Sequence, residues 1–245
     1  SSNVTGTVAP MKEIVELAHD RGALVMSDDA QYAPHHPLDV QALDVDFSAI
    51  SVHKMCGPTG MGVLYGKLEH LKSMNMFQYG GDTVSDVRFE NGKILPEYLP
   101  PPEKFEAGLQ NYAGAIGAGA AAEYLQSIGM HEIEKHERTL LERALNHLCE
   151  MDHVHILGTD DITIKTGLIT FNIDTVSSAH DVATFLNDEF NVMVRSGWHC
   201  AGPFHYQMGI DPKKGTARAS FYLYNNNSDV DVFLEGIDSL IEASS

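Results

Sequence analysis

The sequence predicts an α/β fold in which a mainly parallel sheet is followed by a small α+β region. Three observations carry this prediction. Short apolar runs alternate with helical patterns through residues 1–70. A Gly-Pro-Thr-Gly turn at residues 57–60 joins two of these runs by a connection that is too short for parallel strands. A long Gly- and Pro-rich stretch then separates them from further helical and apolar segments.

The first half is predicted to contain one helix and three strands. Residues 10–19 carry apolar side chains at helical spacing. Residues 23–26 and 47–50 are short apolar runs bounded by polar loops, as expected for neighbouring strands of a parallel sheet. Residues 61–66 follow the tight turn, so this strand is expected to return antiparallel.

The second half is predicted to follow a loop and two helices. The Gly and Pro content of residues 78–104 indicates a long ordered loop. Helices are predicted at residues 113–122 and 133–148 and are expected to connect two domains. The small α+β region is expected to contain apolar runs at residues 168–173 and 192–194, a strand opening at Arg218, and helices at residues 179–188 and 230–241. We therefore expect domains at residues 1–125 and 126–245.

The composition excludes several classes of protein. Lys and Arg number 16 against 34 Asp and Glu, and the formal net charge of −18 disfavours nucleic acid and membranes as partners. The three cysteines are widely spaced without a Cys-x-x-Cys pair, which argues against a disulfide framework or a closed zinc site. No stretch has the length and apolarity needed to cross a bilayer. We therefore expect a protein of the reducing cytoplasm.

Two short motifs place complementary side chains after neighbouring strands. Lys54 closes the tetrapeptide Ser51-Val52-His53-Lys54, and Asp28 follows the earlier apolar run. Sites in parallel sheets lie at the carboxyl ends of the strands, so an amine, an imidazole and a carboxylate are expected at one edge. A lysine can bind an aldehyde as a Schiff base, and a carboxylate can keep a pyridine nitrogen protonated. This combination predicts a pyridoxal phosphate site.

Two further motifs lie in the second half: Arg195-Ser196-Gly197-Trp198-His199-Cys200-Ala201-Gly202-Pro203 and Arg218-Ala219-Ser220-Phe221-Tyr222-Leu223-Tyr224-Asn225. With the lysine motif, they resemble the SufS-type cysteine desulfurases of the class V aminotransferase superfamily in order and spacing. The resemblance covers almost the whole chain from Ser2. It implies fold type I of the pyridoxal-phosphate-dependent transferases. Residues 1–125 would be the C-terminal part of the large domain and residues 126–245 the small C-terminal domain.

The N-terminal half of that family has no counterpart in this sequence. The chain begins at Ser1 without a Met, and Asn3 already matches a motif from the middle of the family. We therefore expect a fragment that lacks part of the cofactor site.

The resemblance implies a role for each side chain near the cofactor. Lys54 matches the lysine that binds the cofactor aldehyde and moves protons, and Asp28 matches the partner of the pyridinium nitrogen. Gln31 matches the residue that hydrogen-bonds the phenolic oxygen. Ser51 and His53 match donors to the cofactor phosphate, and His53 is also expected to be catalytic beside the lysine. Hydroxyl and imidazole groups are suitable phosphate donors.

The resemblance also implies a substrate site and a nucleophile. Asn3 and Arg218 match the pair that holds the substrate carboxylate, and Arg195 is expected to bind substrate beside them. The planar guanidinium of an arginine can hold a carboxylate through two parallel hydrogen bonds. Cys200 matches the nucleophile, and positive charge from Arg195 and His199 is expected to favour its thiolate.

A third segment, Glu106-Ala107-Gly108-Leu109-Gln110-Asn111, precedes the Ala-rich helix. Free backbone N–H groups at a helix N-terminus favour an anion. In the family this loop reaches the cofactor phosphate of the partner subunit, so we expect Gly108 to bind cofactor and the protein to be a homodimer. Leu109 stands where the family usually has a threonine.

The resemblance implies a cysteine desulfurase. It would take sulfur from L-cysteine as a persulfide on Cys200, release L-alanine, and pass the sulfur to an acceptor of the SufE or SufU type for iron–sulfur cluster assembly. Three alternatives stay open: a selenocysteine lyase or another class V aminotransferase or lyase, an incomplete fragment that only dimerises or binds an acceptor, and a zinc site. The zinc site would use His35, His36, His199, Cys200 and His205, but these lack metal-ligand spacing, so no metal is expected.

Overall fold

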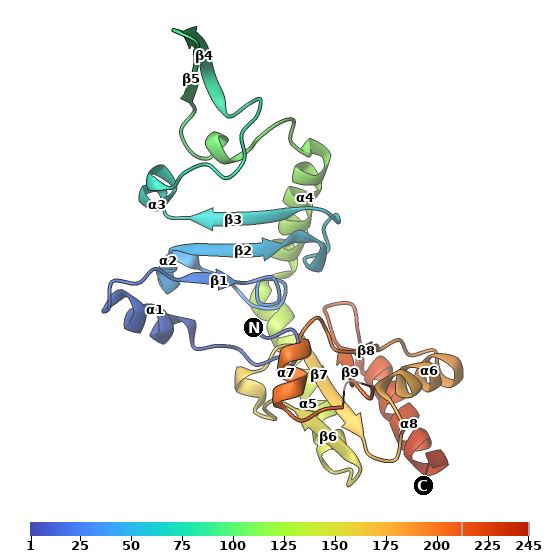
Figure 1. Cartoon of the computed structure of the whole chain (residues 1–245). Coiled ribbons are helices and arrows are strands. Elements are labelled where there is room, and N and C mark those ends of the chain that lie inside the picture. The colour runs from blue at the N-terminus through green and yellow to red at the C-terminus, as the bar shows by residue number, and fades with distance from the viewer. Residues whose placement is uncertain (212, 245) are drawn as a thin grey trace. The chain divides into compact units, whose positions relative to one another are not determined.

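The computed structural model describes residues 1–211 and 213–244, which form two compact units (Figure 1). The sheet unit comprises Met11–Ala30 and Asp39–Leu125. The C-terminal unit comprises Ser1–Pro10, Gln31–Leu38 and Gln126–Ser245. The division at residues 125 and 126 falls inside one long helix, and the domain limits taken from the sequence stay a prediction.

The sheet unit is built on three strands in the order β1-β2-β3. Strand β1 (Met26–Asp28) runs parallel to β2 (Phe47–Ser51), and β3 (Gly62–Gly66) returns antiparallel beside β2. The predicted parallel pair with one antiparallel strand is therefore confirmed. Figure 1 shows β2 between the other two strands.

The first strand begins later than the sequence indicated. Its predicted range was residues 23–26, but the N–H of Ala23 donates to the carbonyl of Ala18 at the end of a helix (2.9 Å). The N–H of Val25 donates to the carboxylate of Asp46 (2.7 Å). The N–H groups of Ala23 and Val25 are therefore engaged outside the sheet, and strand pairing starts only at Met26.

Helices complete the sheet unit. They are α1 (Met11–His19), α2 (Val40–Leu43), α3 (Leu68–Ser73) and most of α4 (Tyr112–Ile128), with 3₁₀ turns η1 (Val52–Lys54) and η2 (Glu103–Phe105). Asp39 caps α2, because its Oδ1 accepts the N–H groups of Gln41 (3.0 Å) and Ala42 (2.9 Å). Within the described residues, no helix combines the length and apolarity needed to span a bilayer.

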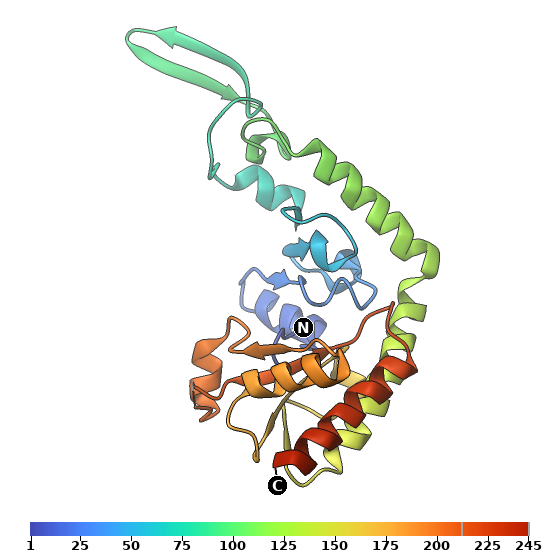
Figure 2. The same ribbon diagram turned by 90° about the vertical axis from the view of Figure 1, so that its right-hand side faces the viewer.

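The segment predicted as a loop contains a β-hairpin, so that prediction was wrong. Strands β4 (Val84–Glu90) and β5 (Lys93–Tyr98) pair antiparallel around Asn91 and Gly92 (Figure 2). Both turn residues have positive φ, 49° and 75°, which a two-residue hairpin turn of type I′ requires. The Asn91-Gly92 pair is the feature of the sequence that favours this hairpin turn. The hairpin is exposed along almost its whole length.

The C-terminal unit contains a four-stranded antiparallel sheet in the order β6-β7-β9-β8. Its strands are β6 (Val154–Leu157), β7 (Leu168–Ile173), β8 (Arg195–Gly197) and β9 (Thr216–Ser220). Its helices are α5 (Met130–Cys149), α6 (Ala179–Phe190), α7 (Gly202–Gln207) and α8 (Asn227–Ser244), with a 3₁₀ turn η3 (Ile162–Ile164). The predicted mixed α+β architecture is confirmed.

One apolar core holds this unit together. Phe171 from β7, Leu148 from α5, Leu186 from α6 and Ile237 from α8 are all fully buried in the same cluster. Each such side chain contributes about 1.5–3 kcal/mol when removed from water. The apolar run at residues 192–194 is not a strand, because the N–H of Val192 closes α6 by donating to the carbonyl of Leu186 (3.0 Å).

Candidate active site

The first group of candidate residues lies at one edge of the sheet unit. Asp28 is the last residue of β1 and is aligned with Ala49 of the parallel strand β2. Ser51 ends β2, and the turn η1 follows it directly. His53 is exposed and Lys54 is half-buried in this turn. The two carboxyl ends therefore present a carboxylate, a hydroxyl, an imidazole and an amine at a common edge.

Val52 anchors the turn that carries the lysine. Its side chain is buried at 4% exposure, and its carbonyl accepts the N–H groups of Met55 (2.9 Å) and Gly57 (3.2 Å). A Cβ on Gly57 would lie 2.4 Å from Cγ1 of Val52, so only glycine allows this close return. The buried Val52 thereby anchors the turn that carries His53 and Lys54, the two residues that follow it.

Asp29 supports this edge, and sequence reasoning missed it. Its carboxylate oxygen accepts the hydroxyls of Ser27 (2.5 Å) and Ser48 (2.6 Å), and its side chain is buried. Asp28, the next residue back, is exposed, and its Oδ1 accepts the N–H of Ala30 (3.0 Å). The buried carboxylate therefore ties β1 to β2 while the preceding one faces outward. Ser27, two residues before Asp29, is the feature of the sequence that could have indicated this hydrogen bond.

Gly108 lies in the sheet unit with φ +80°. Its N–H donates to the carbonyl of Gly81 (2.8 Å), so this group is not free for an anion as the sequence suggested. Asn111 caps the following helix α4 by accepting the N–H of Gly114 (3.0 Å). Leu109 is 84% exposed.

The second group lies in the C-terminal unit around two arginines. Arg195 of β8 is the register partner of Arg218 of β9, so two positive charges face each other across neighbouring strands. Such a pair is unfavourable by itself and favours an anion beside it. Burial and the charge of Arg195 both lower the pKa of Arg218. Nε of Arg218 is buried without a hydrogen-bond partner in the described part of the chain.

Asn3 connects this arginine to the loop that carries the cysteine. Arg218 donates from Nη1 to the carbonyl of Asn3 (2.7 Å), and Asn3 donates from Nδ2 to the carbonyl of His199 (2.7 Å). His199 and Cys200 have positive φ values of 49° and 61°, which are unfavourable for non-glycine residues. Cys200 is exposed. The thiol therefore lies on a constrained loop with a direct link to the arginine pair.

His199 does not supply the positive charge that the sequence suggested. Burial and the nearby Arg218 lower its pKa to about 4, so the ring is neutral at neutral pH. Its Nε2 lies 2.9 Å from Oγ1 of Thr216, and Nε2 of His205 lies 2.9 Å from the same oxygen. Nδ1 of His205 donates to the carbonyl of Ala201 (3.0 Å). Sequence reasoning gave Thr216 and His205 no role in this network.

Gln31 belongs to the C-terminal unit. Its Nε2 lies 3.3 Å from Nε2 of His35, whose Nδ1 lies 2.8 Å from Oε2 of the buried Glu137. The predicted residues thus occur in two groups. Asp28, Ser51, His53, Lys54 and Gly108 belong to the sheet unit, and Asn3, Gln31, Arg195, Cys200 and Arg218 belong to the C-terminal unit.

Cys56 and Cys149 are exposed like Cys200, so exposure alone does not single out the nucleophile. Among residues 1–211 and 213–244, no group of three or more His, Cys, Asp or Glu side chains is arranged to hold a metal.

Comparison with known proteins identifies the family. The family model for aminotransferase class V matches residues 1–233, and the chain belongs to this family, whose cofactor is pyridoxal phosphate. The chain is 46% identical over 241 residues to a probable cysteine desulfurase from Halalkalibacterium halodurans, covering 98% of this chain and 56% of that protein. It is 41% identical over 243 residues to a cysteine desulfurase from Haloferax volcanii, covering 98% and 54%.

Solved structures show the same fold. The cysteine desulfurase CsdA from Escherichia coli matches with a TM-score of 0.89 at 38% identity, covering 99% of this chain and 57% of that one. A cysteine desulfurase from Thermococcus onnurineus matches with a TM-score of 0.92 at 37% identity, covering 99% and 58%. The fold is therefore that of the type I pyridoxal-phosphate-dependent transferases. The chain spans about half the length of the curated relatives it matches.

Proposed function

We propose that the protein is a pyridoxal-phosphate-dependent cysteine desulfurase of the SufS type that uses Cys200 as its nucleophile. The observation that carries the proposal is the exposed thiol of Cys200 on a loop tied through Asn3 to Arg218. An aminotransferase that acts on other amino acids needs the arginine but has no use for a thiol held there. Similarity to cysteine desulfurases along the whole chain supports the same reading.

The residues of the strand edge fit pyridoxal phosphate. When bound, this cofactor draws electrons away from the substrate Cα. Lys54 would bind its aldehyde and move protons at Cα, with His53 beside it as a second catalytic group. Asp28 would pair with the ring nitrogen, and Ser51 and His53 would donate to the phosphate. Gln31 would donate to the phenolic oxygen, and Gly108 would line the phosphate site through its backbone shape.

The arginine pair fits the carboxylate of L-cysteine. Arg218 and Arg195 face each other across β8 and β9, so a carboxylate between them would remove their repulsion. Asn3 holds Arg218 in place by accepting from Nη1 (2.7 Å). This arrangement would fix the bonds at Cα and leave the substrate sulfur free for attack.

The sulfur transfer balances without a further reactant. The thiolate of Cys200 attacks the substrate sulfur, an S–S bond forms, and the Cβ–S bond breaks. The electron pair of the broken bond stays on Cβ, which takes a proton to give L-alanine. The product on the protein is a persulfide on Cys200. A sulfur-acceptor protein of the SufE or SufU type would remove this sulfur in the cytoplasm for iron–sulfur cluster assembly.

Mass spectrometry tests the nucleophile. The full-length protein loaded with cofactor is expected to gain one sulfur atom on Cys200 and to release alanine when L-cysteine is added. Cys200→Ser should keep cofactor binding and lose both products. Cys56→Ser and Cys149→Ser are matched controls at exposed cysteines and should behave like the wild type. Persulfide found only on one of those two residues would refute the assignment, and full alanine release by Cys200→Ser would favour another class V lyase.

A homodimer is part of the proposal. Phe77, Phe89, Leu109 and Ile116 of the sheet unit are between 74% and 91% exposed. Removing such side chains from water is favourable, and a second subunit is an expected cover for them. Leu109, where the family has a polar hydroxyl, would then contribute apolar contact instead of a hydrogen bond.

A further inference from the structure

The C-terminal unit contains a small polar cavity between helix α5 and the segment that enters β7. Glu137 from α5, Thr166 and Gly167 from the segment, and His36 line it. Glu137, Thr166 and His36 are 3%, 1% and 8% exposed. None of these residues belongs to the groups described above as candidates for catalysis.

Each of the three side chains directs an unused polar atom into buried space. Oε1 of Glu137, Nε2 of His36 and Oγ1 of Thr166 are buried and have no hydrogen-bond partner among residues 1–211 and 213–244. Buried polar groups are almost always satisfied by protein or by ordered water. Three such atoms around one cavity therefore indicate a ligand and not three independent defects.

The hydrogen-bonding capacity of these atoms can be assigned. Nδ1 of His36 lies 3.3 Å from Oε1 of Glu134, so a neutral ring carries its proton there and leaves Nε2 as an acceptor. Burial lowers the pKa of His36, which favours this neutral ring.

Glu137 supplies a hydrogen-bond donor that complements the acceptor Nε2 of His36. The amide of Gln31 faces Nε2 of His35, so the proton of a neutral His35 is on Nδ1 and donates to Oε2 of Glu137. Burial raises the pKa of Glu137 to about 9, so the carboxyl is protonated at neutral pH. With Oε2 accepting, the proton is on Oε1, which becomes a donor. The hydroxyl of Thr166 can donate or accept.

The size of the cavity restricts the occupant to a water molecule. The centre of a water-sized sphere can move within about 10 Å³, which is about the minimum for one water. Water also matches the donor and acceptor atoms, since it accepts from Glu137, donates to His36 and bonds Thr166. A cation is disfavoured because the carboxyl of Glu137 is protonated, and anions larger than water do not fit in the cavity. Gly167 preserves the space, because a Cβ there would lie 2.9 Å from Oε2 of Glu137.

We propose that this cavity is the binding site of one internal water molecule, held by Glu137, His36 and Thr166. The water satisfies the acid proton of Glu137 and so keeps the acid form in place. In the acid form, Oε2 of Glu137 accepts the proton of Nδ1 of His35, and Nε2 of His35 is left as the acceptor that faces Gln31. The site therefore fixes the tautomer of a histidine that contacts Gln31, and it exists independently of the proposed enzyme activity.

Oxygen-17 magnetic relaxation dispersion counts internal waters with long residence times and tests the site in the whole chain. Thr166→Val should reduce the count by one, because the variant loses one of three partners and places a larger methyl group in a space for a single water. Thr166→Ser is the matched control and should keep the wild-type count. An unchanged count in a folded Thr166→Val protein overturns the proposal.

A measurement on the unmodified chain covers the case in which the valine variant does not fold. Nuclear Overhauser contacts between a long-lived water and the Thr166 methyl protons are expected in the wild-type spectrum. A crystal structure should show one water within hydrogen-bonding distance of the three atoms. Absence of the contacts, or density for a metal ion or a larger anion in the cavity, overturns the proposal.

Discussion

Arg218 illustrates how much depends on a single side chain. Its guanidinium faces Arg195 across the strand pair and donates to the carbonyl of Asn3 (2.7 Å), while its Nε is buried without a partner in the described chain. Arginine has five N–H donors in a rigid plane, so it can keep the bond to Asn3 and still bind a carboxylate. Lysine has one nitrogen for both tasks.

Arg218→Lys is therefore expected to raise KM for L-cysteine about 10- to 100-fold, the loss of one hydrogen bond between charged groups. Steady-state alanine release by the full-length protein gives KM and kcat. Arg143→Lys is the matched control, since Arg143 forms a half-exposed ion pair with Asp231 and neither residue is a candidate site residue. An unchanged KM in the Arg218 variant would show that this arginine does not bind the substrate carboxylate.

His199 marks the limit of prediction at the residue scale. The sequence placed a histidine beside Cys200 and suggested a positive charge there. The neutral ring results from burial and from Arg218, which is distant in sequence, so neither cause can be read from the motif. The position of Lys54 and Asp28 at one edge of the sheet was easier to predict than their chemistry, because a parallel strand pair by itself brings its carboxyl ends together.

Elements were predicted where local rules decide. The short turn after Lys54 required β3 to be antiparallel, and the register confirms it. The hairpin β4–β5 was missed because Pro96 and the surrounding Gly and Pro residues suggested a loop, although Asn91-Gly92 favours a tight turn. Pro is tolerated in such a two-stranded sheet, since each strand is an edge strand.

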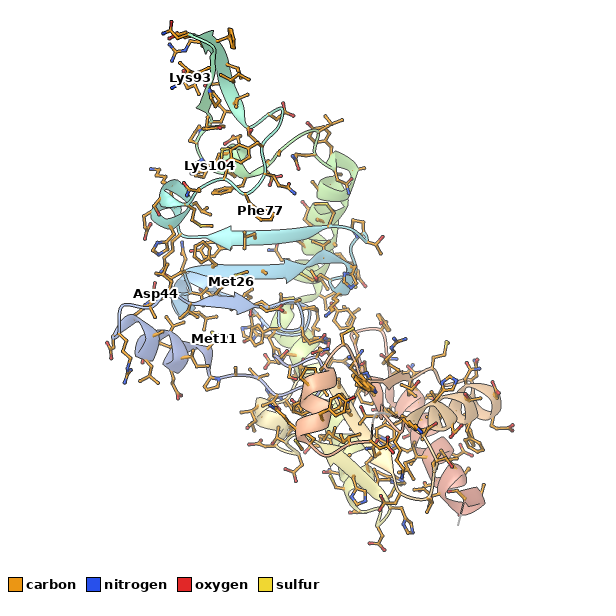
Figure 3. All side chains as sticks on the ribbon, in the orientation of Figure 1. Met11, Met26, Asp44, Phe77, Lys93 and Lys104 are labelled. Atoms are coloured by element: carbon orange, nitrogen blue, oxygen red, sulfur yellow. The ribbon has the colours of Figure 1, made fainter. Side chains whose placement is uncertain are left out.

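The hairpin is a candidate contact in the homodimer proposed above. An isolated two-stranded hairpin is only marginally stable in water, yet Phe89 and its register partner Ile94 expose 74% and 69% of their surface. A partner subunit that covers this pair would stabilise both the hairpin and the dimer. Figure 3 shows Lys93, the residue next to Ile94, on the same hairpin.

Phe89→Ser combined with Ile94→Ser is therefore expected to weaken dimerisation of the full-length protein at least tenfold, since each exposed apolar side chain loses about 1 kcal/mol or more of burial. Sedimentation velocity across a concentration series measures the dissociation constant. Lys93→Ser controls for a change on the same hairpin without loss of apolar surface. Equal dissociation constants for the double variant and the wild type would exclude the hairpin from the interface.

At the scale of the whole molecule, two buried carboxyl groups give opposite dependences of stability on pH. Burial alone would raise the pKa of Asp46 in the sheet unit. Hydrogen bonds from His19, the N–H of Val25, Lys67 and His70 outweigh burial and lower this pKa below its ordinary range. Its stabilising contribution is therefore present above the unfolded value of about 3.9 and is lost as the pH falls below it.

Glu137 in the C-terminal unit has the opposite effect on how stability depends on pH. Burial raises its pKa to about 9, so the folded protein keeps a proton that the unfolded chain loses above about pH 4.3. The stability it contributes is complete below that unfolded value and declines as the pH rises towards the folded value. No local pattern predicts this, since Glu137 is buried against His35, 102 residues away in the sequence.

Glu137→Gln removes the titrating proton while keeping the shape and a hydrogen-bond donor. The difference in free energy of unfolding, variant minus wild type, is expected to increase between pH 5 and pH 9 by up to about 1.4 kcal/mol per pH unit. Denaturant titrations followed by tryptophan fluorescence measure it, because the only tryptophan, Trp198, belongs to the same C-terminal unit. A difference that stays constant or decreases with pH would show that Glu137 is ionised in the folded protein.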